Sequence, residues 1–286
     1  MIKFDKDTKI LIVGLGLIGG SYAMALTKRG CQVSAITRTQ KHIDYALERG
    51  FISYGTTELE PELIASADMI VFALYPTVFI EWIKNNQHLF SPGTLITDVS
   101  GVKGSVVYAV QSILREDVEF ISAHPMAGRE QSGVEFSDDA VFRGANYIVT
   151  PTDKNTPEAI ETCKALGNAL GFARISELSP EKHDEMIGFV SQLTHCIAVS
   201  LVTSNNEEGL EKYTGDSFRD LTRIAKINDV MWSELFLMNK YELLKQMDAF
   251  EDEFRRLRRY ILEENREEMQ KMMRLSTERR KLFDKK

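Results

Sequence analysis

The chain has 286 residues, which suggests about two domains, and 43% of its residues are hydrophobic while 27% are charged. This composition supports a sizeable core and argues against an intrinsically disordered protein. The net charge of −7 argues against a nucleic-acid-binding protein, which would normally carry a basic surface.

The cysteines and the apolar pattern indicate a cytoplasmic protein. Cys31, Cys163 and Cys196 form no CxxC pair, and three scattered cysteines fit a reducing compartment better than a disulfide framework. No apolar run approaches the roughly 20 residues that span a bilayer. The N-terminal residues MIKFD lack the apolar core of a signal peptide. We therefore expect no membrane partner.

The first part of the chain, residues 1–178, alternates short apolar runs with helical stretches. Several runs are almost continuously hydrophobic, as in strands that are buried on both faces of a sheet. The alternation predicts an α/β fold, a Rossmann doubly wound parallel sheet. The predicted strands are Lys9–Val13, Gln32–Ile36, Met69–Leu74, Leu95–Val99, Glu119–Ala123, Tyr147–Thr150 and Phe172–Ile175.

The second part, residues 179–286, is expected to be an all-helical domain. Ser179 followed by Pro180 is typical of a helix start, with serine as the cap and proline at the first position. Further on, apolar residues recur at three- and four-residue spacing and form one stripe. This stripe would close a core within the domain or pack against another subunit. Its members are Met247, Phe250, Phe254, Leu257 and Ile261.

A glycine-rich turn follows the first predicted strand and precedes a helix. Gly14 allows the tight turn, Gly16 lets the backbone approach a pyrophosphate, and Gly19 lets the helix pack close to the strand. The helix N-terminus then offers free N–H groups to the phosphates. This context predicts a dinucleotide site formed by Gly14, Leu15, Gly16, Leu17, Ile18 and Gly19.

The end of the second predicted strand bears on the choice between NAD and NADP. NAD enzymes usually place a carboxylate there for the ribose hydroxyls, but this chain has Thr37, Arg38 and Thr39. Arg38 can pair with a 2′-phosphate, and the two hydroxyls can donate to it. NADP is therefore favoured. NAD stays possible if Arg38 only stacks on the adenine.

Other strand ends carry polar or turn-forming residues where ligands bind in such folds. Leu74, Tyr75 and Pro76 stand at the end of one strand and are expected to lie along the cofactor. His124 follows another. A histidine there is a candidate base, because oxidation of a hydroxyl requires removal of its proton, although a histidine that caps a loop would give the same pattern.

Several segments resemble the prephenate dehydrogenase family. They are the glycine motif, the segment from Asp98 to Gly104, and above all the sequence HPMAGREQSG that begins at His124. The helical half adds SQLTH, which begins at Ser191, and FRDLTRIA, which begins at Phe218. These motifs extend from Lys9 to Asn239, and those that begin at His124 and Phe218 are more specific than the glycine motif.

The resemblance implies a catalytic role for His124, which would bond the ring hydroxyl of the substrate and accept its proton. Family members usually carry a serine one position after Ser100, where this chain has Gly101. Ser100, although offset by one position from that serine, is the candidate for contact with the hydroxyl or with the nicotinamide amide, as a catalytic and cofactor-binding residue.

The resemblance also implies a set of substrate-binding residues. His195 matches a histidine on the substrate-facing helix, Ser191 lies four residues earlier on the same face, and Gln192 stands where the family often has histidine. Arg223 would hold a substrate carboxylate, as a dicarboxylic acid requires, or would form an ion pair with Asp220 or Glu130. Glu130 matches a carboxylate at the entrance of the site, and Trp232 would line the site or belong to the core.

The expected reaction is oxidative decarboxylation of prephenate to 4-hydroxyphenylpyruvate with reduction of NAD(P)+, a step of tyrosine biosynthesis. We expect a homodimer formed through the helical domain. Arogenate or dual-specificity cyclohexadienyl dehydrogenase activity would use the same chemistry, and a β-hydroxyacid or imine-reducing dehydrogenase shares the domain plan. A non-catalytic NADP-binding sensor would leave His124, His195 and Arg223 without a purpose.

Overall fold

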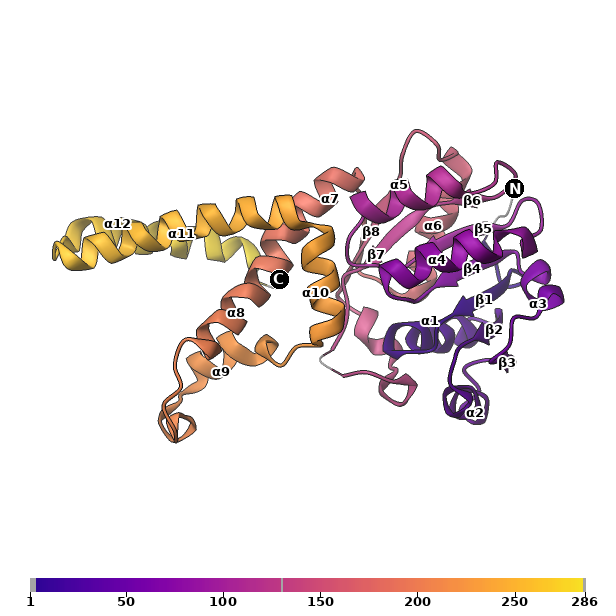
Figure 1. Ribbon diagram of the computed structural model, residues 1–286, viewed down its shortest axis with the longest axis horizontal. Coiled ribbons are helices and arrows are strands. Elements are labelled where there is room, and N and C mark those ends of the chain that lie inside the picture. The colour runs from indigo at the N-terminus through magenta and orange to yellow at the C-terminus, as the bar shows by residue number, and fades with distance from the viewer. Residues whose placement is uncertain (1–3, 130, 285–286) are drawn as a thin grey trace. The chain divides into compact units, whose positions relative to one another are not determined.

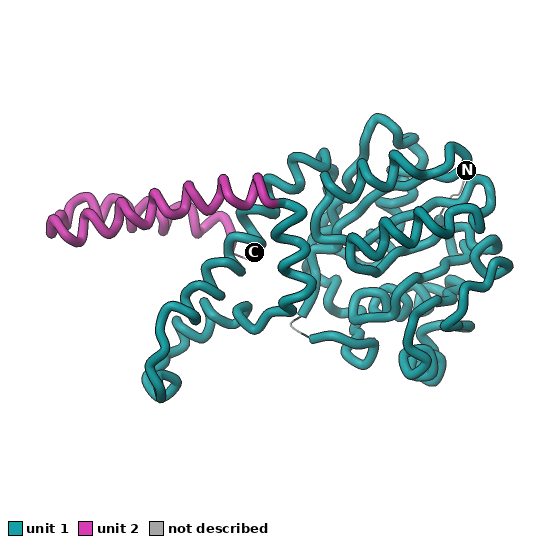
Figure 2. The backbone as a smooth tube through the Cα atoms, in the orientation of Figure 1, with its two compact units in different colours: residues 1–239 teal, residues 240–286 magenta. Residues whose placement is uncertain are grey.

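The computed structural model describes residues 4–129 and 131–284. By internal contacts the chain forms two compact units, Met1–Asn239 and Lys240–Lys286 (Figure 2). The first unit contains both sheets and helices α1 to α10, and the second contains two helices.

A six-stranded parallel sheet forms the centre of the first unit, in the order β3-β2-β1-β4-β5-β6 (Figure 1). This order, with helical crossovers, is that of a doubly wound Rossmann fold, so the expected fold class is confirmed. The strands are β1 (Lys9–Val13), β2 (Gln32–Ile36), β3 (Tyr54–Thr56), β4 (Met69–Phe72), β5 (Leu95–Asp98) and β6 (Glu119–Phe120).

Helices cover both faces of this sheet because its strands alternate apolar side chains between two separate cores. Ile10 and Ile12 of β1 point into one core, and Leu11 and Val13 point into the other. α1, α2 and α6 contribute to the first core, and α3, α4 and α5 contribute to the second. These helices are α1 (Leu17–Lys28), α2 (Gln40–Glu48), α3 (Pro61–Ser66), α4 (Pro76–Asn86), α5 (Gly104–Ile113) and α6 (Pro157–Leu170).

A smaller three-stranded sheet, in the order β7-β8-β9, stands beside the large one. β7 (Ser122–Pro125) is antiparallel to β8 (Asn146–Thr150), which is parallel to β9 (Arg174–Glu177). The single strand expected at Glu119–Ala123 is therefore wrong. The chain pairs with β5 up to Phe120 and then crosses to the small sheet.

Two further expectations need correction. β3 was not predicted, because it is only three residues long, contains Gly55 and leaves Tyr54 exposed. The last strand begins at Arg174 instead of Phe172, because the N–H of Phe172 still bonds the carbonyl of Gly167 and closes the C-terminus of α6.

The helical part of the first unit begins as expected at Ser179, whose hydroxyl accepts from the N–H of Lys182 at 3.2 Å. Three consecutive elements then form one continuous stretch, α7 (Pro180–Ile187), a π-helical turn (Gly188–Leu193) and α8 (Thr194–Thr203). α9 (Asp216–Thr222), a 3-10 turn (Arg223–Ala225) and α10 (Asp229–Met238) complete the unit.

By length and composition alone, the stretch Pro180–Thr203 is long and apolar enough to cross a membrane, with a mean hydropathy of 1.6 over its best window. The expectation that no segment reaches this length was therefore wrong. The stretch nevertheless belongs to the folded unit, because His183, Asp184 and Gln192 are buried and hydrogen-bonded to other elements of it. Phe189 and Val190 are exposed on the same stretch.

The second unit is a hairpin of α11 (Lys240–Leu262) and α12 (Arg266–Arg280), which pack against each other. The predicted apolar stripe lies on α11. Phe250, Phe254 and Ile261 of that stripe are exposed in the single chain. The stripe is therefore not covered by other residues of this unit.

Candidate functional site

The β1–α1 turn has the geometry of a phosphate-binding turn. Gly14 has a φ of +103°, which disfavours any other residue, and a Cβ on Gly19 would lie 1.9 Å from the carbonyl oxygen of Gly14. A Cβ on Gly16 would meet nothing within 4 Å, and no side chain of the described residues caps the helix there. The turn therefore presents free space and uncapped N–H groups to a ligand. Leu15 and Leu17 are buried beneath it, while Ile18 is half-buried.

The Thr37–Arg38–Thr39 segment connects β2 to α2, with Thr39 at the cap position of the helix. It stands at the carboxyl end of β2, next to the carboxyl end of β1. Arg38 is exposed and forms no ion pair within residues 4–129 and 131–284. Its guanidinium is therefore accessible to an anionic group.

The Leu74–Tyr75–Pro76 segment connects β4 to α4 and contacts α10. The hydroxyl of Tyr75 accepts from Nδ2 of Asn228 at 3.1 Å, and the N–H of Thr77 donates to Oε1 of Glu234 at 2.7 Å. Pro76 is buried at the first position of α4. These bonds attach the helical part of the unit to a strand end of the sheet.

His124 lies in β7 beside the carboxyl end of β5. A Cβ built on Gly101, which follows β5, would come within 3.9 Å of Cε1 of His124. Nδ1 of His124 is 2.8 Å from Nε2 of His183, and the ring is half-buried. Burial, His183 and the Lys103 cation lower the pKa of His124 well below its ordinary value, so the ring is neutral at pH 7. A neutral imidazole can accept a proton.

His183 and Asp184 are buried at the fourth and fifth residues after Ser179, and the sequence reasoning did not single them out. Nδ1 of His183 is 2.8 Å from Oδ1 of Asp184. The carboxylate also accepts from the N–H groups of Lys103 and Gly104 at the start of α5, both at 2.8 Å. Burial is the main cause that lowers the pKa of His183.

A buried ion pair lies beneath His124. Nζ of Lys103 is 3.0 Å from Oδ2 of Asp98, and both side chains are almost completely inaccessible, at 0% and 1%. The same ammonium donates to the carbonyl of Ala123 at 2.7 Å, immediately before His124. Ser122 and Ser100 donate their hydroxyls to the Asp98 carboxylate. The network thus holds β7 at Ser122 and Ala123, the two residues before His124, and so fixes the position of the imidazole.

Ser100 is buried inside this network, whereas Gly101 is the residue beside His124. The hydroxyl of Ser100 bonds Asp98 and the carbonyl of Val102. It is thus engaged within the loop, and the catalytic and cofactor-binding roles expected for it stay predictions. A Cβ on Gly101 would have only ordinary contacts, at 3.6 Å from Leu235 and 3.9 Å from His124.

The residues expected to bind substrate from the helical part lie around α8 and α10. The ring of Trp232 stacks on that of His195, with centroids 3.7 Å apart. Nδ1 of His195 donates to the carbonyl of Ser191 at 2.9 Å, as their four-residue spacing allows. Gln192 is buried instead, where its amide donates to the carbonyl of Leu235 and accepts from Asn239.

Arg223 opens the 3-10 turn that packs against α8, the helix of His195. The residue is exposed and lies in the same region of the fold as the stacked pair. Glu130, which was expected at the entrance of the site, lies outside the described residues. The part of the chain described here contains no cluster of three or more His, Cys, Asp or Glu side chains that could hold a metal ion.

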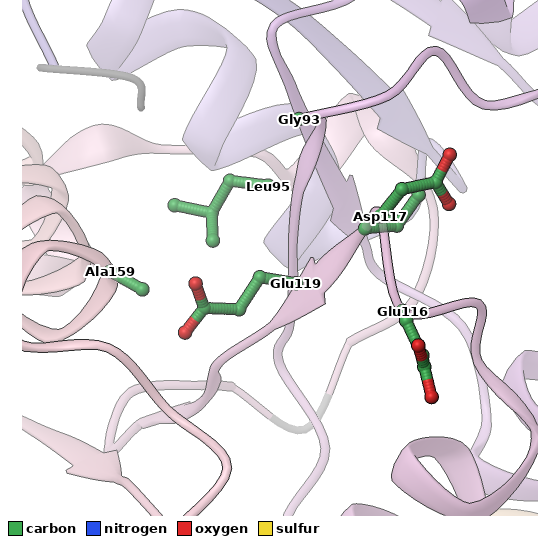
Figure 3. Close-up of a pocket in the computed structure, with 7 residues that line it drawn as sticks. Gly93, Leu95, Glu116, Asp117, Glu119 and Ala159 are labelled. Atoms are coloured by element: carbon green, nitrogen blue, oxygen red, sulfur yellow. The ribbon is translucent and has the colours of Figure 1, made fainter.

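A surface pocket lies elsewhere, at the amino ends of β5 and β6. It is lined by Gly93, Leu95, Glu116, Asp117, Val118, Glu119 and Ala159 (Figure 3). Glu119 extends toward Ala159 in Figure 3 and accepts from the N–H and the hydroxyl of Thr156, which starts α6. The pocket is lined by three acidic residues, so it does not suit an anionic substrate. It also lies at the amino ends of the strands, away from His124 and from the carboxyl ends where the ligands of such folds bind.

Comparison with known proteins adds the family. Residues 22–175 match the model described as "Prephenate dehydrogenase, nucleotide-binding domain", and residues 179–275 match "Prephenate dehydrogenase, dimerization domain". The chain is 32% identical over 271 residues to a prephenate dehydrogenase of Bacillus subtilis, which covers 92% of this chain and 72% of that protein. A cyclohexadienyl dehydrogenase of Zymomonas mobilis is 28% identical, over 94% of this chain and 96% of that protein.

A solved structure is similar over almost the whole chain. It is the prephenate dehydrogenase of Aquifex aeolicus in complex with hydroxyphenyl propionate and NAD+. The two share 33% identity and a TM-score of 0.89, and the match covers 97% of this chain and 98% of that one.

Proposed function

This chain belongs to the prephenate dehydrogenase family and is an oxidoreductase with a nicotinamide-dinucleotide-binding domain, and we propose that it converts prephenate to 4-hydroxyphenylpyruvate in tyrosine biosynthesis. The observation that carries the proposal is the environment of His124. His124 has a neutral, half-buried imidazole at the strand ends where the ligands of such folds bind, with a ring nitrogen held by His183.

We propose that the dinucleotide is held by the glycine turn, the β2 end and the β4 end. The open space over Gly16 and the uncapped start of α1 fit a pyrophosphate. Thr37, Arg38 and Thr39 would take the 2′ position, and the exposed Arg38 supports NADP as the preferred form. Leu74, Tyr75 and Pro76 would lie along the nicotinamide half. When bound, the oxidised cofactor supplies the acceptor for hydride.

His124 acts in this proposal as the general base. Its Nε2 takes the proton of the C4 hydroxyl as hydride departs, so a ketone forms in the ring. Loss of the carboxylate as CO2 then gives an aromatic product. Since aromatisation drives this loss, the protein needs mainly to hold the substrate and to provide one base. Ser100 stays a candidate for a supporting role, and Gly101 leaves space next to the imidazole.

We propose that the dicarboxylic substrate contacts the helical part of the first unit. Arg223 would form an ion pair with a substrate carboxylate. His195, which stacks on Trp232, would place its polar edge next to the substrate ring. Ser191 and Gln192 precede His195 on the same helical stretch, and Gln192 would act through the position of Leu235. Glu130 is proposed to control entry of the substrate.

We also propose a homodimer in the cytoplasm, with functional domains at 1–178 and 179–286. The boundary is supported by the two family models, which meet between residues 175 and 179. The exposed Phe189 and Val190 and the uncovered stripe of α11 supply apolar surface for association. The three unpaired cysteines support a reducing compartment. Light scattering at micromolar concentration should give twice the chain mass of 32.5 kDa, and a monomer mass would refute the dimer.

The deciding experiment measures the absorbance of reduced nicotinamide with prephenate or arogenate, each with NAD+ or NADP+. Turnover of prephenate is expected, with a higher kcat/KM for NADP+. An Arg38→Ala variant should lose that preference, while Arg49→Ala, in an exposed arginine after α2, serves as the matched control.

Each alternative predicts a different result in this assay. Turnover of arogenate alone would move the substrate to the amino acid. Tight cofactor binding without turnover of either acid would refute the proposal and favour a sensor.

A further inference from the structure

The buried pair His183–Asp184 takes no part in the proton and hydride transfers of the proposed reaction, yet His183 directly contacts the proposed base. Three groups form an unbroken line from the α5 N-terminus to the half-buried ring of His124. Asp184 bonds His183 at 2.8 Å, and His183 bonds Nδ1 of His124 at 2.8 Å. His183 is 0% exposed and Asp184 is 6% exposed, so water does not compete for these bonds.

The chemistry of Asp184 sets the direction of the hydrogen bonds. Its two oxygens accept from the N–H groups of Lys103 and Gly104, so the group acts as an ionised carboxylate at a helix N-terminus. A carboxylate can only accept, and Nδ1 of His183 must therefore carry the proton that is donated to it.

That assignment determines the tautomer of the proposed base. A neutral His183 with its proton on Nδ1 has a lone pair on Nε2, which accepts from Nδ1 of His124. His124 then carries its proton on Nδ1 and keeps Nε2 unprotonated. Without this fixed order, both ring nitrogens of His124 would compete for the single proton.

We propose that His183, oriented by Asp184, is a positioning residue that fixes His124 in its base tautomer and then takes up the proton that His124 would otherwise retain. The inference rests on the proposed function for its second part, because the proton comes from the substrate hydroxyl. Its first part concerns the protein alone.

The proposed transfer balances in two steps. The substrate O–H bond breaks and an Nε2–H bond forms on His124, while hydride leaves the substrate carbon for the nicotinamide. The Nδ1–H bond of His124 then breaks and an Nε2–H bond forms on His183. The positive charge thereby moves from His124 to an imidazolium that is bonded to the Asp184 carboxylate.

The surrounding charges favour this displacement. The charge of Lys103 lowers the pKa of both histidines, whereas Asp184 and Asp98 raise the pKa of His183. Burial opposes a charge on either histidine. Since only His183 has a carboxylate in direct contact, it is the better site for the transient cation.

Two substitutions separate the parts of the proposal. In His183→Gln the side-chain amide oxygen can replace Nε2 and accept from His124, but it cannot take up a proton. In His183→Asn the amide can reach Asp184 but not His124. His88→Gln, at an exposed histidine of the same chain, is the matched control.

We expect kcat to fall about 10²-fold or more in His183→Asn, which is the lower end of the contribution of a positioned base, and only about 10-fold in His183→Gln, which keeps the acceptor for His124. KM should stay within about threefold in both, because neither variant removes a substrate contact. Nearly equal losses in the two variants, with raised KM and a lower thermal midpoint, would reduce His183 to a structural residue and overturn the proposal. Full activity of His183→Asn would also overturn it.

Imidazole ¹⁵N NMR tests the tautomer without turnover. The five histidines of the chain can be assigned from single variants. In the wild-type protein the proton of His124 should be on Nδ1, and it should remain there in His183→Gln but become mixed in His183→Asn. A proton on Nε2 in the wild-type protein would refute the relay whatever the substrate is. Absence of turnover with the expected tautomer would instead refute the proposed reaction.

Discussion

Replacement of Lys103 by methionine tests a fully buried charge, which lies beneath the proposed base. The methionine side chain is of similar length and leaves no large cavity, so the change mainly removes charge and hydrogen bonds. Asp98 would lose its cation, and the carbonyl of Ala123 would lose a donor at 2.7 Å. Loss of one partner from a buried ion pair costs about 3–5 kcal/mol.

The hydrogen-bond donors that Asp98 keeps decide where in this range the cost falls. Asp98 keeps bonds from the hydroxyls of Ser122 and Ser100 and from the N–H groups of Ser100 and Ala123. These favour the lower end, about 3 kcal/mol, which is a large share of the roughly 5–15 kcal/mol that stabilises a typical domain. The double variant Asp98→Asn with Lys103→Met should recover most of the loss, because no unpaired charge stays buried.

Urea unfolding followed by circular dichroism measures the free energy. Lys84→Met is the control, because Lys84 is 63% exposed and its nearest carboxylate oxygen is 4.0 Å away, so it should cost less than about 1 kcal/mol. If Lys103→Met costs no more than this control, the pair is not buried as described and the reasoning fails. Failure of the double variant to recover stability would instead assign the cost to lost packing or to the Ala123 carbonyl.

Three further predictions concern the site and its pH dependence. His124→Asn should lower kcat by at least about 10²-fold while circular dichroism stays unchanged, and retained activity would exclude His124 as the base. Arg223→Lys should raise KM for the acid by about 10-fold with kcat nearly constant, because lysine cannot form the bidentate pair; an unchanged KM would remove Arg223 from the substrate site. The pKa values of His124 and His183 are lowered from 6.5, so the unfolded chain binds more protons below that pH and stability should fall as the pH decreases from about 6.5. Urea midpoints at pH 8 and pH 5.5 check this, because the midpoint of the wild-type protein should be lower at pH 5.5. The prediction would be contradicted if the midpoint were the same at the two pH values, both in the wild-type protein and in His183→Gln.

The features that sequence reasoning predicted depend on local physics. The turn at Gly14 requires a positive φ, the helix cap at Ser179 satisfies an N–H three residues away, and β1 alternates between two cores. Each of these signals lies within a few residues of the feature that it predicts. The short β3 has no such signal, because its three residues include only one buried side chain and so show no apolar pattern.

The contacts that sequence reasoning missed join distant segments. His183 meets His124 across 59 positions, and Asp184 meets Lys103 across 81. Their only local trace is an adjacent His–Asp pair early in a helix, which is also an ordinary surface pattern. The orientation of Ser100 toward Asp98 instead of His124 depends on a backbone turn that composition does not determine.

The π-helical turn Gly188–Leu193 has a consequence for the relation between the two histidines of the helical stretch. Such a turn holds one residue more than an α-helical turn, as a single insertion into a helix would leave. It therefore sets the rotational phase between His183, which bonds the base, and His195, which stacks on Trp232. Deletion of one residue from the turn would rotate everything after it by about 100°. One inserted residue is thus enough to let a single helix present one histidine to the nucleotide-binding domain and another to α10.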